Sequence, residues 1–196
     1  MYEKILHLGI LSILIYEKIF TIKWLKSIRH QLSNYEKVKD YFIIQRFVTY
    51  TSVGNNLAIL CSFYSLLFNT QPDKCFFILT WNTLFSVTFG YWILIFPKSF
   101  NNNEPQNYLS EFLSHGPGLF FYSLLAKYYQ IDFDFEYVIY PILLGYFYLF
   151  FIWYPWYKIT DDTIYVVMKN GWLQRIFTIF TMNCFSFLGY LLYQFI

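Results

Sequence analysis

Hydrophobic residues in this chain gather into long blocks, and charged residues lie mostly between the blocks. A helix needs about 20 predominantly apolar residues to cross a hydrocarbon core about 30 Å thick. The pattern therefore predicts an all-α, polytopic membrane protein, a bundle of about six transmembrane helices in a single integral membrane domain covering residues 1–196. The predicted spans are approximately 4–24, 47–68, 75–96, 112–129, 137–157 and 172–196.

The first span is the least uniform, because Glu17 and Lys18 fall near its far end. We expect these two side chains to pair with each other or to extend toward the membrane interface. The polar, basic stretch 26–46 that follows is expected to contain a short interfacial helix.

Composition supports the membrane assignment and excludes several functions. The chain is 57% hydrophobic and 13% charged, whereas soluble domains are about 25% charged. A formal net charge of +2 is too small to suggest a nucleic-acid partner. The three cysteines form no CxxC pair, so they are expected to be free thiols rather than metal or redox ligands.

The distribution of basic residues predicts the orientation of the bundle. Ten Lys and Arg residues lie in or beside the loops that follow spans one, three and five. Three lie on the opposite side of the membrane, and Lys18 is not counted on either side because its position is ambiguous. By the positive-inside rule, these three loops face the cytoplasm or its equivalent, and six spans place both termini on the opposite side. The ten are Lys23, Lys26, Arg29, Lys37, Lys39, Arg46, Lys98, Lys158, Lys169 and Arg175, and the three are Lys4, Lys74 and Lys127.

The first candidate for chemistry is His115, which is followed by Gly116-Pro117-Gly118 and then by an apolar run. Pro and Gly are tolerated in the first turn of a helix, where backbone N–H groups lack an intrahelical partner. His115 is therefore expected at a helix mouth, with water within reach. His7 and His30 do not pair with it at a metal-ligand spacing, so no metal or cofactor is expected.

Thr49 lies at the start of the second predicted span, and His115 lies at the start of the fourth. Both starts are predicted at the same face of the membrane. A hydroxyl nucleophile needs a base that takes its proton, and a histidine serves that role. Asp161 and Asp162 are predicted on the same face and could orient the histidine. Thr is equally an ordinary residue at the N-cap of a helix. The predicted spans contain four asparagines: Asn55, Asn56, Asn82 and Asn183. Side-chain amides inside membrane helices most often form hydrogen bonds between helices. In fewer proteins they line a path for a polar substrate.

Four short motifs support a resemblance to a known family. They are Arg46-Phe47-Val48-Thr49-Tyr50, Phe112-Leu113-Ser114-His115-Gly116, Gly145-Tyr146 with Trp153, and Met182-Asn183 with Leu188-Gly189. In this order they resemble motifs of the androgen-induced gene family, six-span membrane proteins known as threonine-type hydrolases of fatty acid esters of hydroxy fatty acids. The resemblance implies a six-span fold, with Thr49 at the position of the family's proposed nucleophile.

The chain departs from that family at the proposed base. The family motif runs His-Gly-x-His, its second histidine is the proposed catalytic partner, and Gly118 occupies that position here. The remaining His115 lies one helical turn earlier, a shift of about 5 Å. Catalytic geometry tolerates far smaller displacements, so this departure predicts a degenerate active site.

We therefore expect an accessory or structural subunit of a larger membrane complex, in contact with lipids and other membrane subunits. The mitochondrial inner membrane, with a respiratory assembly, and the endoplasmic reticulum are the expected locations. The alternative is an intramembrane threonine hydrolase of fatty acid esters of hydroxy fatty acids. In it Thr49 is the nucleophile, His115 the base, and Asn55 or Asn183 a donor to the oxyanion. A carrier or channel is disfavoured, because no run of ionisable residues crosses the spans.

Overall fold

The computed structural model describes residues 2–31, 35–45, 47–97, 108–162 and 172–196, and within them every regular element is helical. Five helices are long and apolar enough to cross a membrane, so the predicted all-α, multi-pass membrane fold is confirmed. They are Tyr2–Gln31, Tyr50–Phe68, Lys74–Ile95, Phe135–Thr160 and Arg175–Tyr193.

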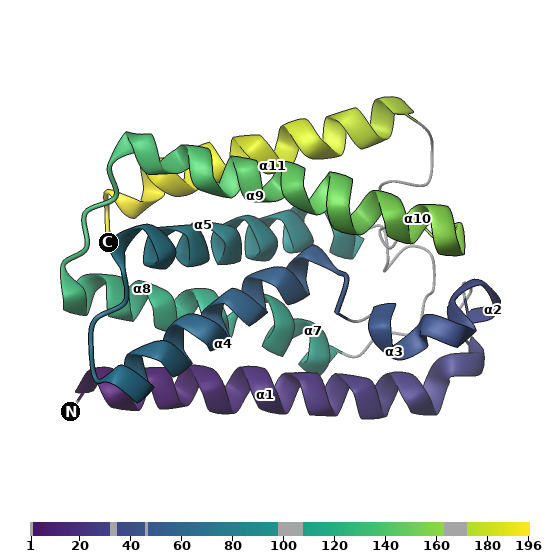
Figure 1. The fold of residues 1–196 in the computed structure, drawn as a ribbon, viewed down its shortest axis with the longest axis horizontal. Helices are drawn as coiled ribbons and strands as arrows, with labels where there is room; N and C mark the ends of the chain where they lie inside the picture. Colours follow the sequence, from purple (N-terminus) through teal and green to yellow (C-terminus); the bar gives the residue numbers. More distant parts are fainter. Residues whose placement is uncertain (1, 32–34, 46, 98–107, 163–171) are drawn as a thin grey trace.

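These helices carry the labels of Figure 1. Helix α1 is Tyr2–Ile28 with η1 (Arg29–Gln31), α4 is Tyr50–Phe68, and α5 (Lys74–Gly90) continues as the π-helix η3 (Tyr91–Ile95). A further composite helix joins η4 (Phe135–Val138), α9 (Ile139–Tyr148), the π-helix η5 (Leu149–Trp153) and α10 (Tyr154–Thr160), and α11 is Trp172–Tyr193.

The prediction of one continuous helix over 112–129 is wrong. The structure has two helices, α7 (Tyr108–His115) and α8 (Pro117–Tyr129), separated at Gly116. Pro117 has no backbone N–H and its ring clashes with the carbonyl four residues earlier, which bends or breaks a helix. Here the helix breaks, because Gly116 has the non-helical dihedrals φ −134° and ψ −66°. The polar stretch before His115, expected to be a loop as far as Glu111, forms the first helix of this pair.

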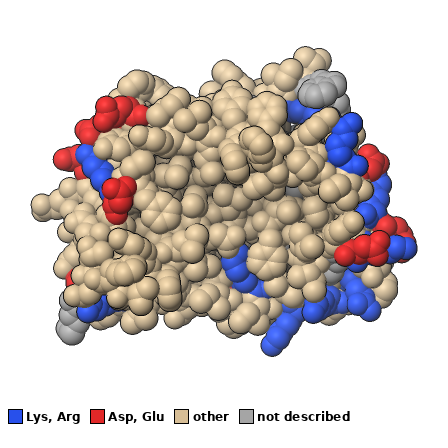
Figure 2. All heavy atoms as spheres, viewed as in Figure 1, with Lys and Arg blue, Asp and Glu red and all other residues tan. Residues whose placement is uncertain are grey.

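The long segments alternate in direction, and both termini lie at the same end of the bundle (Figure 1). Lys and Arg side chains gather mainly at the opposite end, around α2, α3 and α10, and the middle of the same face carries few charges (Figure 2). This agrees with the predicted placement of the basic loops. Arg46, Lys98 and Lys169 lie outside the described residues.

The basic stretch after α1 forms short helical turns, as the sequence predicts: α2 (Tyr35–Val38), η2 (Lys39–Tyr41) and α3 (Phe42–Gln45). Lys37 Nζ lies 2.8 Å from Asp161 Oδ2 and connects this segment to the end of α10. The hydrogen bond from Lys37 lowers the pKa of Asp161, and Asp161 in turn raises the pKa of Lys37. Both side chains are exposed, so this ion pair adds little stability.

Helix α5 is the central helix of the bundle and packs against α4, α8, α9 and α11. Polar side chains join it to its neighbours: Asn82 Nδ2 donates to the carbonyl of Ser186 at 2.9 Å, and Trp81 Nε1 donates to Ser123 Oγ at 3.0 Å. Interhelical hydrogen bonds of this kind hold membrane helices together. By contrast, large apolar side chains are exposed on the outer helices, where lipid would cover them; examples are Leu60, Phe63, Phe150, Phe151 and Phe180.

Gly189 on α11 packs tightly against α5. A Cβ atom at this position would lie 3.0 Å from Phe85 Cδ1 and 3.3 Å from Asn82 Nδ2. Small residues let membrane helices pack with their backbones close together. At Gly145 on α9, by contrast, the nearest atom to an added Cβ is the Tyr50 hydroxyl at 4.0 Å.

This difference predicts opposite effects of two identical substitutions. Alanine is favoured over glycine inside a helix by about 0.5–1 kcal/mol. Gly145→Ala should therefore leave stability unchanged or raise it, whereas Gly189→Ala should lower it by about 1–3 kcal/mol through overpacking. Thermal unfolding of the two variants in the same detergent micelles measures the difference, and equal melting temperatures would contradict the packing described.

Candidate functional site

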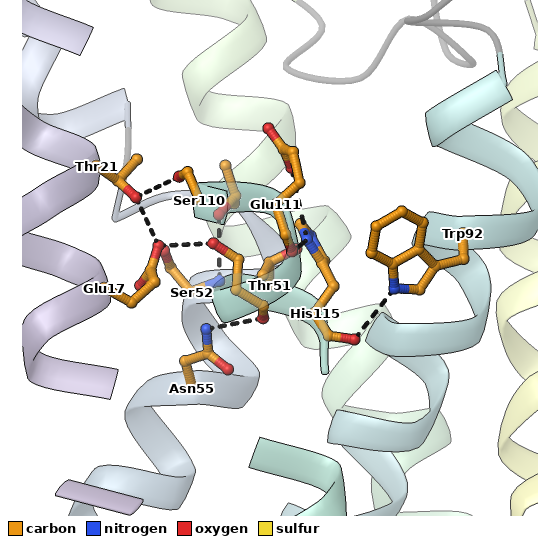
Figure 3. A network of polar contacts seen from close by, with 11 residues as sticks. Glu17, Thr21, Thr51, Ser52, Asn55, Trp92, Ser110, Glu111 and His115 are labelled. Atoms are coloured by element: carbon orange, nitrogen blue, oxygen red, sulfur yellow. Dashed lines mark hydrogen bonds and ion pairs between the residues drawn. The ribbon is translucent and has the colours of Figure 1, made fainter. Parts of the chain in front are cut away.

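The break between α7 and α8 creates the most polar region of the bundle interior. Because Pro117 begins α8, the carbonyl groups at the end of α7 need partners from other helices. Asn55 Nδ2, from α4, donates to the carbonyl of Ser114 at 3.2 Å. Trp92 Nε1, from η3, donates to the carbonyl of His115 at 3.4 Å (Figure 3). Side chains of two neighbouring helices thus fix the end of α7.

His115 is the last residue of α7, and both of its ring nitrogens have partners. Nδ1 lies 2.9 Å from the carbonyl oxygen of Glu111 and 3.6 Å from its carboxylate Oε2. Nε2 lies 3.1 Å from Thr51 Oγ1 on α4 (Figure 3). A carbonyl oxygen only accepts hydrogen bonds, so in the neutral ring Nδ1 carries the proton and Nε2 has the lone pair. The Thr51 hydroxyl therefore donates to Nε2, which is the geometry of a hydroxyl nucleophile paired with its base.

Aromatic side chains of η3 hold the imidazole in place. The ring of Tyr91 stacks on that of His115, with centroids 3.5 Å apart and an interplanar angle of 9°. Trp92 is the next residue and reaches the backbone of His115. π-Helical turns are rare and often occur at functional sites, and here the turn contributes two consecutive residues to one histidine. His115 is 4% exposed, so its side chain is more deeply buried than the expected position at a helix mouth.

A second group of polar contacts surrounds Glu17 of α1, which is 1% exposed. Ser114 Oγ donates to Glu17 Oε1 at 2.6 Å, and Thr21 Oγ1 donates to the same oxygen at 3.0 Å. Thr21 Oγ1 also lies 2.5 Å from Ser110 Oγ (Figure 3). Glu17 is therefore buried against α7 rather than extended to the interface, which corrects the prediction from sequence. Lys18 instead places Nζ 5.4 Å from the centre of the Phe47 ring.

The threonine in contact with His115 is Thr51 and not Thr49. Thr49 is the N-cap of α4, and its side chain accepts a hydrogen bond from the backbone N–H of Ser52 at 3.1 Å. This is the capping role that the sequence analysis left open for Thr49. Residues two apart on a helix face different directions, so the two threonines cannot exchange places without rotating α4.

The other predicted site residues are distributed as follows. Asn55 lies at the site, where its side chain donates a hydrogen bond to the carbonyl of Ser114. Asn183 on α11 does not take part in this contact and donates to the hydroxyl of Tyr146 on α9 at 3.3 Å. Asp161 pairs with Lys37, and Asp162 accepts from Gln45 at 2.9 Å, so these aspartates bind groups other than the histidine. The residue that orients His115 is Glu111, four positions earlier on α7, and the sequence analysis missed it because it placed Glu111 in a loop.

Gly118, the position of the family's proposed base, faces the same interior region. A Cβ atom there would lie 3.2 Å from Leu84 Cδ2 and 3.8 Å from Asn55 Oδ1. A histidine at residue 118 would therefore require Leu84 to move. The histidine that contacts a threonine hydroxyl is His115, three residues earlier.

Thr51 also lines a pocket of about 40 Å³ between α4, α5, η3, α9 and α11. Its walls are mostly apolar and include Val87, Leu94, Tyr148 and Met182. Thr51 thus binds an imidazole through its hydroxyl and also borders an apolar space. Among the described residues, no group of three or more His, Cys, Asp or Glu side chains is placed to hold a metal ion.

Comparison with known proteins found no matching family model, no similar curated protein and no similar solved structure.

The buried contacts of Glu17 predict how α1 holds α7. In Glu17→Leu the hydroxyls of Thr21 and Ser114 lose a shared acceptor, and each buried hydrogen bond contributes about 0.5–1.5 kcal/mol to stability. Glu17→Gln keeps a carbonyl oxygen at the same place, so its unfolding temperature should lie closer to that of the wild type. Thermal unfolding in micelles distinguishes the variants, and equal destabilisation by Gln and Leu would show that these hydroxyls do not depend on the acceptor.

Proposed function

We propose that this chain is an intramembrane hydrolase of lipid carboxylic esters, with Thr51 as nucleophile and His115 as general base. The observation that carries the proposal is the hydrogen bond between Thr51 Oγ1 and His115 Nε2, with Nδ1 fixed on the carbonyl of Glu111. Nucleophile, base and orienting group are aligned in the order that acyl transfer requires. The side chain of Glu111, 3.6 Å from Nδ1, would stabilise the imidazolium as the proton arrives.

The proposed reaction has two steps. Thr51 Oγ attacks the ester carbonyl carbon while its proton passes to His115 Nε2, and the alcohol leaves with that proton. A water molecule then gives a proton to His115 and attacks the acyl group on Thr51. The carboxylic acid is released, and Thr51 Oγ recovers its proton from the imidazolium. Asn55 Nδ2 is held by the carbonyl of Ser114 and would have to exchange partners to act as an oxyanion donor.

The surroundings of Thr51 favour a lipid substrate. The residue lies at the start of a predicted membrane span and lines an apolar pocket. The resemblance to the androgen-induced gene family adds the expectation of fatty acid esters of hydroxy fatty acids as substrates. The expected locations remain the endoplasmic reticulum and the mitochondrial inner membrane. Our proposal departs from that family in the threonine used and in the position of the histidine.

The expectation of an accessory subunit rests in part on the absence of a histidine at residue 118. That expectation assumed that the catalytic histidine must be at residue 118, as in the family, and that the nucleophile must be Thr49. Contact between Thr51 and His115 supplies a hydroxyl–imidazole pair without either condition. The hydrolase is therefore the better supported of the two functions, and an accessory role in a larger membrane complex is the proposal that follows if the test below fails.

Matched threonine variants test the proposal. Purified protein in detergent micelles is assayed with p-nitrophenyl butyrate, and release of p-nitrophenolate is followed. Thr51→Ala and His115→Ala should each lower kcat/KM by about 10²-fold or more, because each removes half of the nucleophile–base pair. Thr49→Ala removes only a helix cap, which costs about 0.5–2 kcal/mol of stability, and should keep kcat/KM within about threefold of the wild type.

The assay is run well below the melting temperature of all three variants, so loss of fold is not mistaken for loss of chemistry. Activity lost in Thr49→Ala and kept in Thr51→Ala would overturn the assignment and restore the nucleophile implied by the family resemblance. Wild-type protein that is folded and inactive on every ester tested would overturn the hydrolase proposal itself.

A further inference from the structure

The ring of Tyr91 lies directly on the imidazole of His115. The two ring centroids are 3.5 Å apart, and the ring planes are tilted by only 9°. Carbon atoms in contact lie about 3.5–4.0 Å apart, so rings this close have almost no lateral offset and meet face to face. Tyr91 is 8% exposed and His115 4% exposed, so this contact is buried within the bundle.

This geometry suits a charged imidazole better than a neutral one. Neutral aromatic rings avoid the direct face-to-face arrangement and prefer offset or edge-to-face pairs with centroids about 4.5–7 Å apart, because their faces carry negative charge density. A cation over the face of a tyrosine ring is attracted instead, and the attraction is stronger when water is excluded. The imidazolium form of His115 gains this attraction, and the neutral form does not.

Other groups around the imidazole determine how much this contact matters. The carboxylate of Glu111 on α7 lies 3.6 Å from Nδ1 and also favours a positive charge on the ring (Figure 3). Thr51, the contact from α4, is uncharged, and Glu17 of α1 binds the neighbouring Ser114. Burial opposes the charge, because a buried imidazolium loses its hydration. The contacts with Glu111 and Tyr91 offset part of that cost.

We propose that Tyr91 is a positioning residue for the His115 base: its ring face fixes the imidazole and stabilises the imidazolium that forms when the proton of Thr51 Oγ passes to Nε2. This inference rests on the proposed hydrolase function and adds the group that stabilises the charge on the base. In that mechanism the charge appears only as the proton is transferred, so the contact favours the transition state over the ground state.

The first test measures the protonation of His115 by NMR and does not require enzyme activity. Histidine labelled with carbon-13 at Cε1 is incorporated into the protein in detergent micelles. The His115 signal, assigned by its loss in His115→Gln, is followed from pH 4 to pH 9. Tyr91→Leu removes the ring face, so the midpoint of protonation should fall by about half a pH unit or more. Tyr91→Phe keeps the ring face and should stay close to the wild type.

The pH profile of hydrolysis is the second measurement. The proposed mechanism needs a neutral His115, so kcat/KM for p-nitrophenyl butyrate should rise with pH and level off above the protonation midpoint. In Tyr91→Leu the rising limb should move to lower pH, and the plateau should be about 10-fold lower. In Tyr91→Phe the limb should stay in place. A role in packing alone would lower the plateau without moving the limb.

A matched control on η3 is Trp92→Phe. It removes the N–H that binds the carbonyl of His115 but leaves the ring of Tyr91 in place, so it should keep the wild-type midpoint. If Tyr91→Leu does not fold, Tyr91→Met serves the same purpose, because a flexible thioether side chain fills irregular gaps without a ring face.

The outcomes separate this inference from the hydrolase proposal. Equal midpoints in the wild type, Tyr91→Phe and Tyr91→Leu would show that the inference is wrong, and ester turnover that depends on Thr51 would then leave the hydrolase proposal intact. A wild-type imidazole that stays neutral down to pH 4 would also overturn the inference. A midpoint that shifts as expected in a protein without ester turnover would support the effect of Tyr91 on the imidazole and overturn the hydrolase proposal.

Discussion

The structure around His115 follows from one constraint: in a hydrocarbon environment, backbone carbonyl groups must find hydrogen-bond donors within the protein. Pro117 interrupts the helix between α7 and α8, and the end of α7 then depends on other helices. Asn55 binds the carbonyl of Ser114, and Trp92 binds that of His115. Buried side-chain polar groups also need partners, and the hydroxyls of Ser114 and Thr21 donate to the buried Glu17. The polar groups that stabilise the broken helix also fix the position of the imidazole.

In this arrangement the hydroxyl of Thr51 and the imidazole of His115 meet inside the helical bundle, and both residues belong to helices rather than to loops. Thr51 is in the first turn of α4, and His115 ends α7, so both side chains project from regular structure. Tyr91 stacks on the ring, while the carbonyl of Glu111 sets which nitrogen bears the proton. Catalytic groups on rigid elements with supporting contacts keep their geometry better than groups on loops. An apolar pocket lies beside Thr51, and in the proposed function substrate would approach the pair there.

The sequence was sufficient for the fold and for part of the site. Apolar blocks of spanning length identified the membrane helices. Gly116-Pro117-Gly118 indicated a helix boundary next to His115, but His115 was expected to open a helix and instead ends α7. The sequence could not distinguish Thr49 from Thr51, because which of two threonines caps α4 depends on where the helix begins. It also missed Glu111 and misplaced Glu17. Both errors came from treating the polar lead-in to His115 as a loop: as helix α7, it places Glu111 four residues from His115 and presents Ser114 to Glu17.

The most direct test of the central claim is to locate the covalent intermediate. The protein in micelles is treated with a fluorophosphonate probe, digested, and the adduct is assigned to a residue by tandem mass spectrometry. Our account predicts a single adduct on Thr51, absent when His115 is replaced by Ala and unaffected when Thr49 is replaced by Ala. An adduct on Thr49 or Ser114, or no adduct under conditions that label a known hydrolase in the same micelles, would contradict it.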